Sequence, residues 1–124
     1  MKNFFILTLV LLIPMGAQSI KWYSPSKGFA KAEKEKKIVL IDVYTDWCGW
    51  CKTMDKETYS NKSVTKALNK NFVCVNYNPE KDGNIKIGGK VYKPESFENM
   101  AKVDGYPATA FFRSNGKFIE TVTG

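Results

Sequence analysis

The feature that most constrains this chain is a pair of cysteines, Cys48 and Cys51, separated by two residues. The pair follows an apolar run, residues 38–41, and leads into residues 52–59, whose sequence predicts a helix. A cysteine at a helix start lies near unpaired N–H groups and the positive end of the helix dipole, which favour the thiolate. Because the thiolate is the nucleophile in disulfide exchange, we interpret the pair as redox-active. Cys48 would lie at the exposed helix start, and Cys51, one turn further in, would be the more buried resolving thiol.

Two other interpretations of the cysteine pair remain open. A zinc site needs about four ligands, and the chain has three cysteines and no histidine. A purely structural disulfide is the other alternative, but so short a ring constrains very little of the unfolded chain. The composition therefore favours the redox interpretation, without a metal.

The first 19 residues resemble a secretory signal. Lys2 provides the charged start, residues 4–13 are apolar, and residues 17–19 offer small side chains for cleavage. The apolar run is too short to span a bilayer comfortably, so we expect no stable membrane insertion after cleavage. A short hydrophobic first strand is the alternative, which Pro14 disfavours. The sequence therefore predicts a signal peptide, residues 1–19, and one exported domain, residues 20–124.

The charge distribution argues against nucleic acid as a partner. The formal net charge is +7, but the 19 lysines and arginines are scattered along the chain and only Arg113 is an arginine. Nucleic-acid-binding faces usually cluster their basic residues and read bases with arginine. The absence of histidine also removes the commonest general base and metal ligand. We interpret the charge as that of a solvated surface.

The pattern of apolar residues and turn signals predicts alternating helices and strands. Residues 38–44, which open with four consecutive apolar side chains, are typical of a central strand covered on both faces. Residues 20–23 should form an extended lead-in. Ser63 should cap the third helix, and Gly105 should lie just past the end of the fourth. The predicted order is helix 25–36, strand 38–44, helix 52–58, helix 64–69, strand 72–77, hairpin 85–92, helix 94–103 and strands 108–112 and 117–123. This order implies an α/β fold of three layers around a mixed sheet.

Three segments make the chain resemble the thioredoxin superfamily. Residues 39–52, Val-Leu-Ile-Asp-Val-Tyr-Thr-Asp-Trp-Cys-Gly-Trp-Cys-Lys, are similar to the family's strand and active-site segment, and Gly-Tyr-Pro at 105–107 is similar to its cis-proline loop. Residues 114–117 resemble the family's hairpin turn, and the likeness covers residues 27–124. The nearest variant is the exported bacterial group with tryptophan between the cysteines. The resemblance implies a thioredoxin-like fold with a small hairpin insert, in the periplasm or cell envelope of a bacterium.

The resemblance also implies roles for individual residues. Cys48 would be the attacking thiolate and Cys51 the resolving thiol. Asp42 would be the buried acid beneath Cys51 that assists its proton transfer, although a solvated aspartate at the strand end is the alternative. Pro107 would be the proline that lies cis beside the disulfide, although an ordinary trans loop proline is far commoner.

Three departures from the family pattern bear on function and fold. Trp50 replaces the usual proline or histidine, so a strongly oxidising character loses support. Cys74 or Asn76 stands where the family has a buried lysine, and we expect Cys74 to be a small core residue rather than a third redox thiol. The chain stops at Gly124, where the family's final helix would begin. We therefore expect a truncated domain without a C-terminal helix, in which the sheet near Phe111 or Phe112 lies open.

Together these features predict a thiol–disulfide oxidoreductase. It would act on protein disulfides, lean towards reduction, need no cofactor and take its electrons from another protein. Exposed aromatic and backbone groups around the cysteines would form a substrate-docking patch: Trp47, Gly49, Trp50, Tyr106 and Pro107. The alternative is a thioredoxin-like binding module that holds a partner protein, or a soft metal ion such as Cu(I), through the two thiolates.

Overall fold

The computed structural model describes residue 9 and residues 19–124, so the predicted signal segment lies almost wholly outside the described residues. The helices and strands follow one another as β1 (Trp22–Tyr23), α1 (Pro25–Glu35), β2 (Ile38–Val43), α2 (Gly49–Glu57), α3 (Lys62–Asn71), β3 (Phe72–Tyr77), β4 (Ile85–Ile87), β5 (Lys90–Tyr92), α4 (Pro94–Met100), β6 (Ala108–Phe112) and β7 (Phe118–Thr123). None of the helices described here is both long and apolar enough to cross a membrane.

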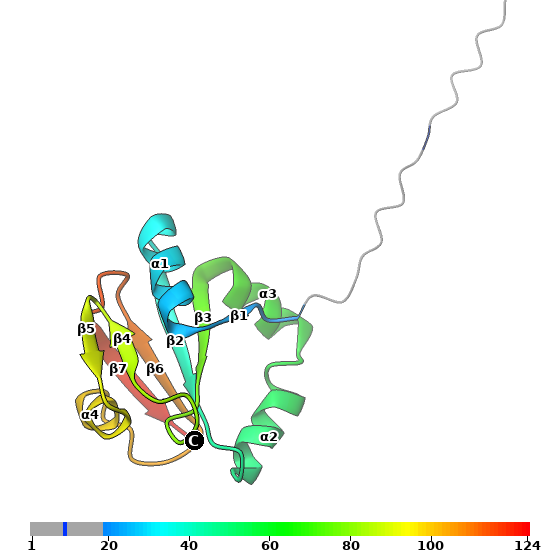
Figure 1. Cartoon of the computed structure of the whole chain (residues 1–124). Helices are drawn as coiled ribbons and strands as arrows, with labels where there is room; N and C mark the ends of the chain where they lie inside the picture. Colours follow the sequence, from blue (N-terminus) through cyan, green and yellow to red (C-terminus); the bar gives the residue numbers. More distant parts are fainter. Residues whose placement is uncertain (1–8, 10–18) are drawn as a thin grey trace, which may run out of the picture.

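A five-stranded mixed sheet forms the middle layer, in the order β1-β3-β2-β6-β7. β1 and β2 run parallel to β3, whereas β6 runs antiparallel to β2 and β7. Strand β2 thus lies at the centre, and residues 39–43 are all buried, as the apolar run predicts. The predicted three-layer α/β fold and its hairpin insert, β4–β5, are confirmed (Figure 1). Residues 22–23 are more than a lead-in, because they pair with β3 as an edge strand.

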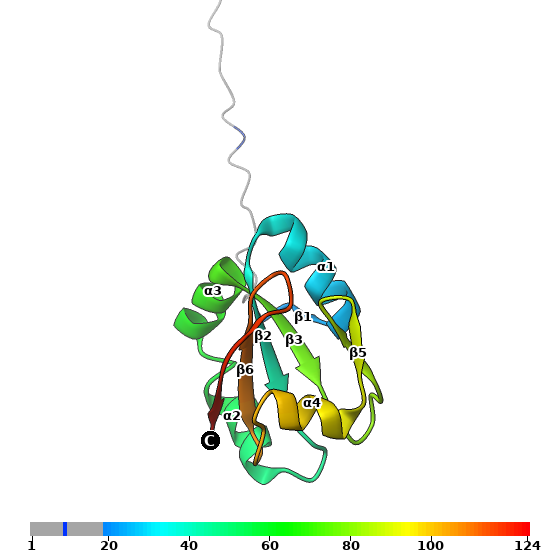
Figure 2. The same ribbon diagram turned by 90° about the vertical axis from the view of Figure 1, so that its left-hand side faces the viewer.

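The two faces of the sheet are covered unequally. α1, α4 and the β4–β5 hairpin cover one face and enclose the larger core, to which Phe29, Ile85 and Phe97 contribute. α2 and α3 lie on the opposite face, over a smaller cluster that includes Leu40 and Tyr59 (Figure 2).

The expectation of an open sheet is wrong for Phe112 and holds only in part for Phe111. Phe112 points into the larger core and is fully buried. Phe111 points to the opposite face, where it packs on the smaller cluster and is half-buried. Residues of one strand alternate between the two faces of the sheet, so the two neighbouring phenylalanine side chains pack against different clusters.

Three helix boundaries differ from the predictions. α2 begins at Gly49, inside the cysteine motif, rather than at Lys52. α3 begins at Lys62 because the Asn61 side chain caps it by accepting hydrogen bonds from two backbone N–H groups, so Ser63 is not the cap. α4 ends at Met100, and its chain reversal uses Lys102 in the left-handed region rather than Gly105.

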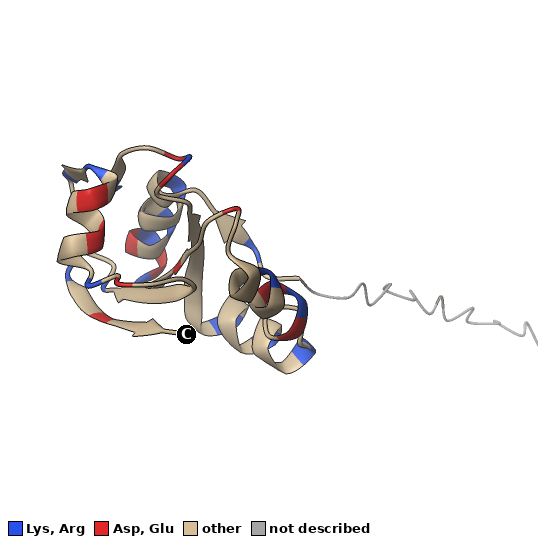
Figure 3. Cartoon of the chain, turned by 90° about the horizontal axis from the view of Figure 1, so that it is seen from below, with Lys and Arg blue, Asp and Glu red and all other residues tan. Residues whose placement is uncertain are grey.

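Charged residues of both signs are interspersed along α1 and α2, whereas α3 carries only lysines and α4 only glutamates (Figure 3, seen from below). Lys31 and Glu35, one turn apart on α1, form an exposed ion pair at 3.4 Å. This arrangement is typical of a solvated surface.

Two glycines fix the hairpin insert against the β6–β7 turn. Gly88 and Gly116 both have positive φ angles, 58° and 90°, and their backbones touch. A Cβ atom on Gly116 would lie 2.5 Å from the Gly88 Cα, closer than real Cβ contacts come. The contact therefore needs glycine for both its conformation and its space.

Gly116→Ala should accordingly destabilise the domain by several kcal/mol, because strain and a backbone clash add. Gly89→Ala is the matched control: its φ is 81°, but nothing lies within 4 Å of its Cβ position. That variant should lose only about 1–2 kcal/mol. Equilibrium denaturation of both variants measures the difference, and equal losses would contradict the importance of the contact.

Candidate active site

The two cysteines of the motif form a disulfide at the start of α2. Their Cα atoms are 5.3 Å apart. Cys48 is the N-cap residue of α2, and its sulfur accepts a hydrogen bond from the Cys51 backbone N–H at 3.1 Å. Strand β2, at the centre of the sheet, leads into this helix start. The Cys48 sulfur thus accepts a hydrogen bond from a backbone N–H group of the helix start and lies at the positive end of the helix dipole, as the sequence predicts.

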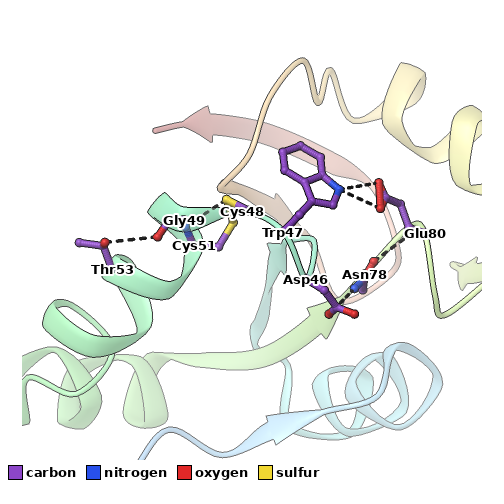
Figure 4. The surroundings of a disulfide bond; sticks show 8 residues. All are labelled: Asp46, Trp47, Cys48, Gly49, Cys51, Thr53, Asn78 and Glu80. Carbon is purple, nitrogen blue, oxygen red and sulfur yellow. Dashed lines mark hydrogen bonds between the residues drawn. A yellow bond between two sulfur atoms is a disulfide. The ribbon is translucent and has the colours of Figure 1, made fainter.

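The expected contrast in burial between the two cysteines is wrong for this disulfide form. Cys48 is 4% exposed and Cys51 is 5% exposed. The loop that leads into β6 passes directly beside the disulfide (Figure 4). Gly49, which lies between the two cysteines in the sequence, is the first residue of α2 and is exposed. The disulfide is therefore close to the surface but covered at the sulfur atoms.

Two exposed tryptophan rings flank the disulfide, and the docking role that the sequence assigns to them remains a prediction. Trp47 is 67% exposed and Trp50 is 74% exposed. Trp47 meets the half-buried Tyr106 edge-on, with ring centroids 5.9 Å apart. Neighbouring tryptophans exposed to this extent are uncommon away from interaction surfaces.

A groove runs from the disulfide region along α2. The Tyr106–Pro107 peptide is cis, as the resemblance implies, and Pro107 is buried. The groove has a volume of about 350 Å³ and a mainly apolar lining: Trp50, Thr53, Met54, Glu57, Thr58, Tyr106, Pro107 and Gly124. Trp50, Tyr106 and Pro107 were predicted from the sequence. Thr53 and Met54 were not, although helical spacing places them one turn beyond Trp50.

Asp42 lies in the middle of β2 and is buried, with 4% of its surface exposed. Burial, and to a smaller extent the nearby Asp55 carboxylate, raise the pKa of Asp42 from its ordinary 3.8 to about 7. Neither ion pair found in residues 19–124 involves Asp42. A carboxyl group with a pKa near neutrality can both accept and donate a proton. The burial is confirmed, and the role in proton transfer remains a prediction.

Two further titratable groups share the α2 side of the sheet. Cys74 is 2% exposed, and burial together with the Asp42 charge raises its pKa to about 11. It is the buried core residue that the sequence predicts. Tyr59, which the sequence analysis missed, is 8% exposed, and burial raises its pKa. Its hydroxyl has no hydrogen-bond partner among the described residues.

The loop after β3 contacts the active-site segment through polar side chains. The Trp47 indole N–H donates to the Glu80 carboxylate, and the Asn78 side chain donates to Asp46 at 3.2 Å (Figure 4). Lys81 forms an ion pair with the same aspartate at 2.7 Å. No periodic pattern or motif predicts these contacts, because they join segments about 30 residues apart.

Comparisons with known proteins agree with this geometry. A family model described as "Thioredox_DsbH: Protein of unknown function, DUF255" matches residues 10–123. Spermatogenesis-associated protein 20 of Mus musculus is 37% identical over 57 residues, which are 45% of this chain and 7% of that protein. The thiol:disulfide interchange protein DsbD of Pseudoalteromonas atlantica is 31% identical over 97 residues, 77% of this chain and 15% of that protein. The chain therefore spans only a small part of these curated relatives.

Solved structures confirm the fold. A putative disulphide-isomerase from Bacteroides thetaiotaomicron superposes with a TM-score of 0.68 and 26% identity, over 88% of this chain and 84% of that one. A structure titled "DsbH Oxidoreductase" superposes with a TM-score of 0.64 and 18% identity, over 89% and 76%. The described domain is thus a thioredoxin-like fold that carries a Cys-x-x-Cys pair.

Proposed function

The chain belongs to the thioredoxin-like family described as Thioredox_DsbH, and from this premise we propose that it is a thiol–disulfide oxidoreductase acting on the disulfides of other proteins. The observation that carries the proposal is the Cys48–Cys51 disulfide at the start of α2. It lies beside a cis-proline loop and is flanked by exposed aromatic rings. The names of the DsbD and disulphide-isomerase relatives support the same class of reaction.

The exchange proceeds in two balanced steps. In the reduced domain, the Cys48 thiolate attacks one sulfur of a partner disulfide; that S–S bond breaks, a mixed disulfide forms, and the departing partner thiolate takes a proton. Cys51 then loses its proton and attacks the Cys48 sulfur, which releases the second partner thiolate. The partner gains two electrons and becomes a dithiol, while the domain becomes the disulfide. A dithiol protein donor restores the reduced form.

Asp42 supplies the proton acceptor for the second step. Its carboxyl is buried on the central strand that leads to the cysteines, and its pKa of about 7 lets it be deprotonated when Cys51 must ionise. The family resemblance assigns Asp42 this role, as the acid beneath the second cysteine.

We further propose that the domain favours reduction of its partners. Trp50 brings no charge to the cysteine pair, so it cannot stabilise the Cys48 thiolate as a cationic side chain would. Stabilising the reduced form is what makes a dithiol pair strongly oxidising. A reduction potential nearer thioredoxin's, about −270 mV, than DsbA's, about −120 mV, is therefore expected.

The location proposed for this chemistry is the bacterial cell envelope. The signal-like residues 1–19 and the DsbD relatives, which come from bacteria, support it. A disulfide-exchanging domain also needs partners whose disulfides persist, and these are found mainly outside the cytoplasm.

Turnover tests the proposal. The purified domain should catalyse reduction of insulin disulfides with dithiothreitol as the electron donor. The alternative function, a module that holds a partner or Cu(I) through its thiols, predicts binding of the metal without turnover. No group of three or more metal-binding acids and cysteines is found in the described part of the chain. Stoichiometric Cu(I) binding by the domain, together with insulin reduction no faster than the uncatalysed rate, would favour that alternative.

A further inference from the structure

The aromatic ring of Trp47 is held in place despite its exposure. Its indole N–H donates to both carboxylate oxygens of Glu80, at 2.9 and 3.1 Å. Glu80 lies in the loop that follows β3, outside the cysteine motif. A hydrogen bond to a charged acceptor is stronger than one between neutral groups, so this contact restrains a side chain that would otherwise sample several rotamers.

A second carboxylate restrains the neighbouring ring. The Tyr106 hydroxyl donates to Glu98 Oε2 at 3.0 Å, and Glu98 lies on α4. Tyr106 meets Trp47 nearly perpendicularly, at 84°, with centroids 5.9 Å apart. Four side chains therefore touch in series: Glu80, Trp47, Tyr106 and Glu98.

The Glu80 end of this series is itself fixed. Its backbone N–H donates to the side-chain oxygen of Asn78 at 3.0 Å, and Asn78 is 1% exposed. The Asn78 side chain also donates to Asp46, beside the tryptophan. The loop after β3 is thereby joined to the active-site segment at both Asp46 and Trp47 (Figure 4).

The other tryptophan of the site lacks such support. Trp50 is 74% exposed, and its side chain makes no hydrogen bond within the described residues. It lines the groove along α2, opposite the loop that carries Tyr106 and Pro107. The site thus has one restrained aromatic wall, Trp47 with Tyr106, and one unrestrained wall at Trp50.

We propose that Glu80 and Glu98 are positioning residues for partner binding, which fix the Trp47–Tyr106 pair as a preformed wall beside the disulfide. A partner segment that docks next to Pro107 meets a surface that is already ordered, so less conformational entropy is lost on binding. This inference rests on the proposed function, and it concerns the affinity for protein partners rather than the chemistry at sulfur.

The two glutamates can be tested with pairs of variants. Glu80→Ala and Glu98→Ala should each raise the KM for insulin about tenfold while kcat changes less than about twofold, because the sulfur chemistry is untouched. Glu80→Gln and Glu98→Gln keep an oxygen acceptor and should recover most of the affinity. Reduction of a small aromatic disulfide, Ellman's reagent, should be unchanged in all four. Glu33→Ala, on the exposed face of α1, is the control.

A second measurement separates this inference from the proposed function. In a Trp22→Phe, Trp50→Phe background, Trp47 is the sole tryptophan, and its time-resolved fluorescence anisotropy reports local motion of the ring. Glu80→Ala should increase that motion, and Glu80→Gln should restore restraint. Unchanged motion and unchanged KM in the alanine variants would overturn the inference while wild-type turnover stands. Absence of wild-type turnover would overturn the proposed function, while the anisotropy still decides whether the glutamates position the ring.

Discussion

Replacing Cys48 with serine should lower the turnover of insulin disulfides at least about a thousandfold, to the uncatalysed rate. A serine hydroxyl does not ionise at neutral pH, so no nucleophile remains at the start of α2. The helix N-terminus should hold the thiol pKa of the reduced Cys48 below about 8.5, the ordinary value. Initial rates with dithiothreitol as donor measure the effect.

The other two cysteines provide the controls for that experiment. Cys51→Ser should also lose turnover, because the mixed disulfide is no longer resolved within the domain. Cys74→Ala should keep at least about half of the wild-type rate, since Cys74 is buried and its pKa of about 11 keeps it protonated. Substantial turnover by Cys48→Ser, or loss in Cys74→Ala, would contradict the assignment of the nucleophile.

Asp42→Asn should make the oxidised domain more stable at pH 8, by about 2 kcal/mol, and slow its exchange reaction about tenfold. In the wild type, folding raises the pKa of Asp42 from 3.8 to about 7. Between these values the unfolded state binds fewer protons than the folded state, so stability falls as pH rises and levels off above pH 7. The shift corresponds to about 4 kcal/mol, of which burial of the asparagine amide cancels a part.

Denaturation at pH 4 and pH 8 checks the sign of this prediction. From pH 4 to pH 8 the free energy of unfolding of the wild type should fall relative to that of Asp42→Asn. Asp104→Asn, at an exposed position, should show the same fall as the wild type. Asp55→Asn should lower the Asp42 pKa, because the Asp55 charge contributes to raising it. A variant Asp42→Asn that is less stable at pH 8 would indicate that the carboxylate makes favourable interactions instead.

The parts of the fold and site that could be predicted are those that depend on residues close together in the sequence. Four apolar residues before the cysteines predicted the central strand, and the two-residue spacing predicted the disulfide at a helix start. Burial of Asp42 was implied by the family resemblance, which the contiguous residues 39–52 carry. Cys74 was likewise predicted as a core residue from its strand, Phe72–Tyr77.

The features that could not be predicted depend on contacts between distant segments. Glu80 and Glu98 contact the site through loops and helices that the tertiary fold brings together, and a polar residue in a turn carries no signal of its partner. Cys48 proved buried, and a loop from the far end of the chain passes beside it. The cap of α3 was missed by two residues because Asn61 and Ser63 are both good caps, and the tertiary structure selects one.

Covalent trapping tests most directly whether Cys48 is the thiol that attacks partner disulfides. Reduced Cys51→Ser protein is mixed with oxidised insulin, the product is alkylated and digested, and the cross-linked peptides are identified by mass spectrometry. The two-step mechanism predicts a stable mixed disulfide between Cys48 and an insulin cysteine, and none in the Cys48→Ser protein treated in the same way. A cross-link carried by Cys74, by Cys51 of the Cys48→Ser protein, or by no cysteine at all would contradict it.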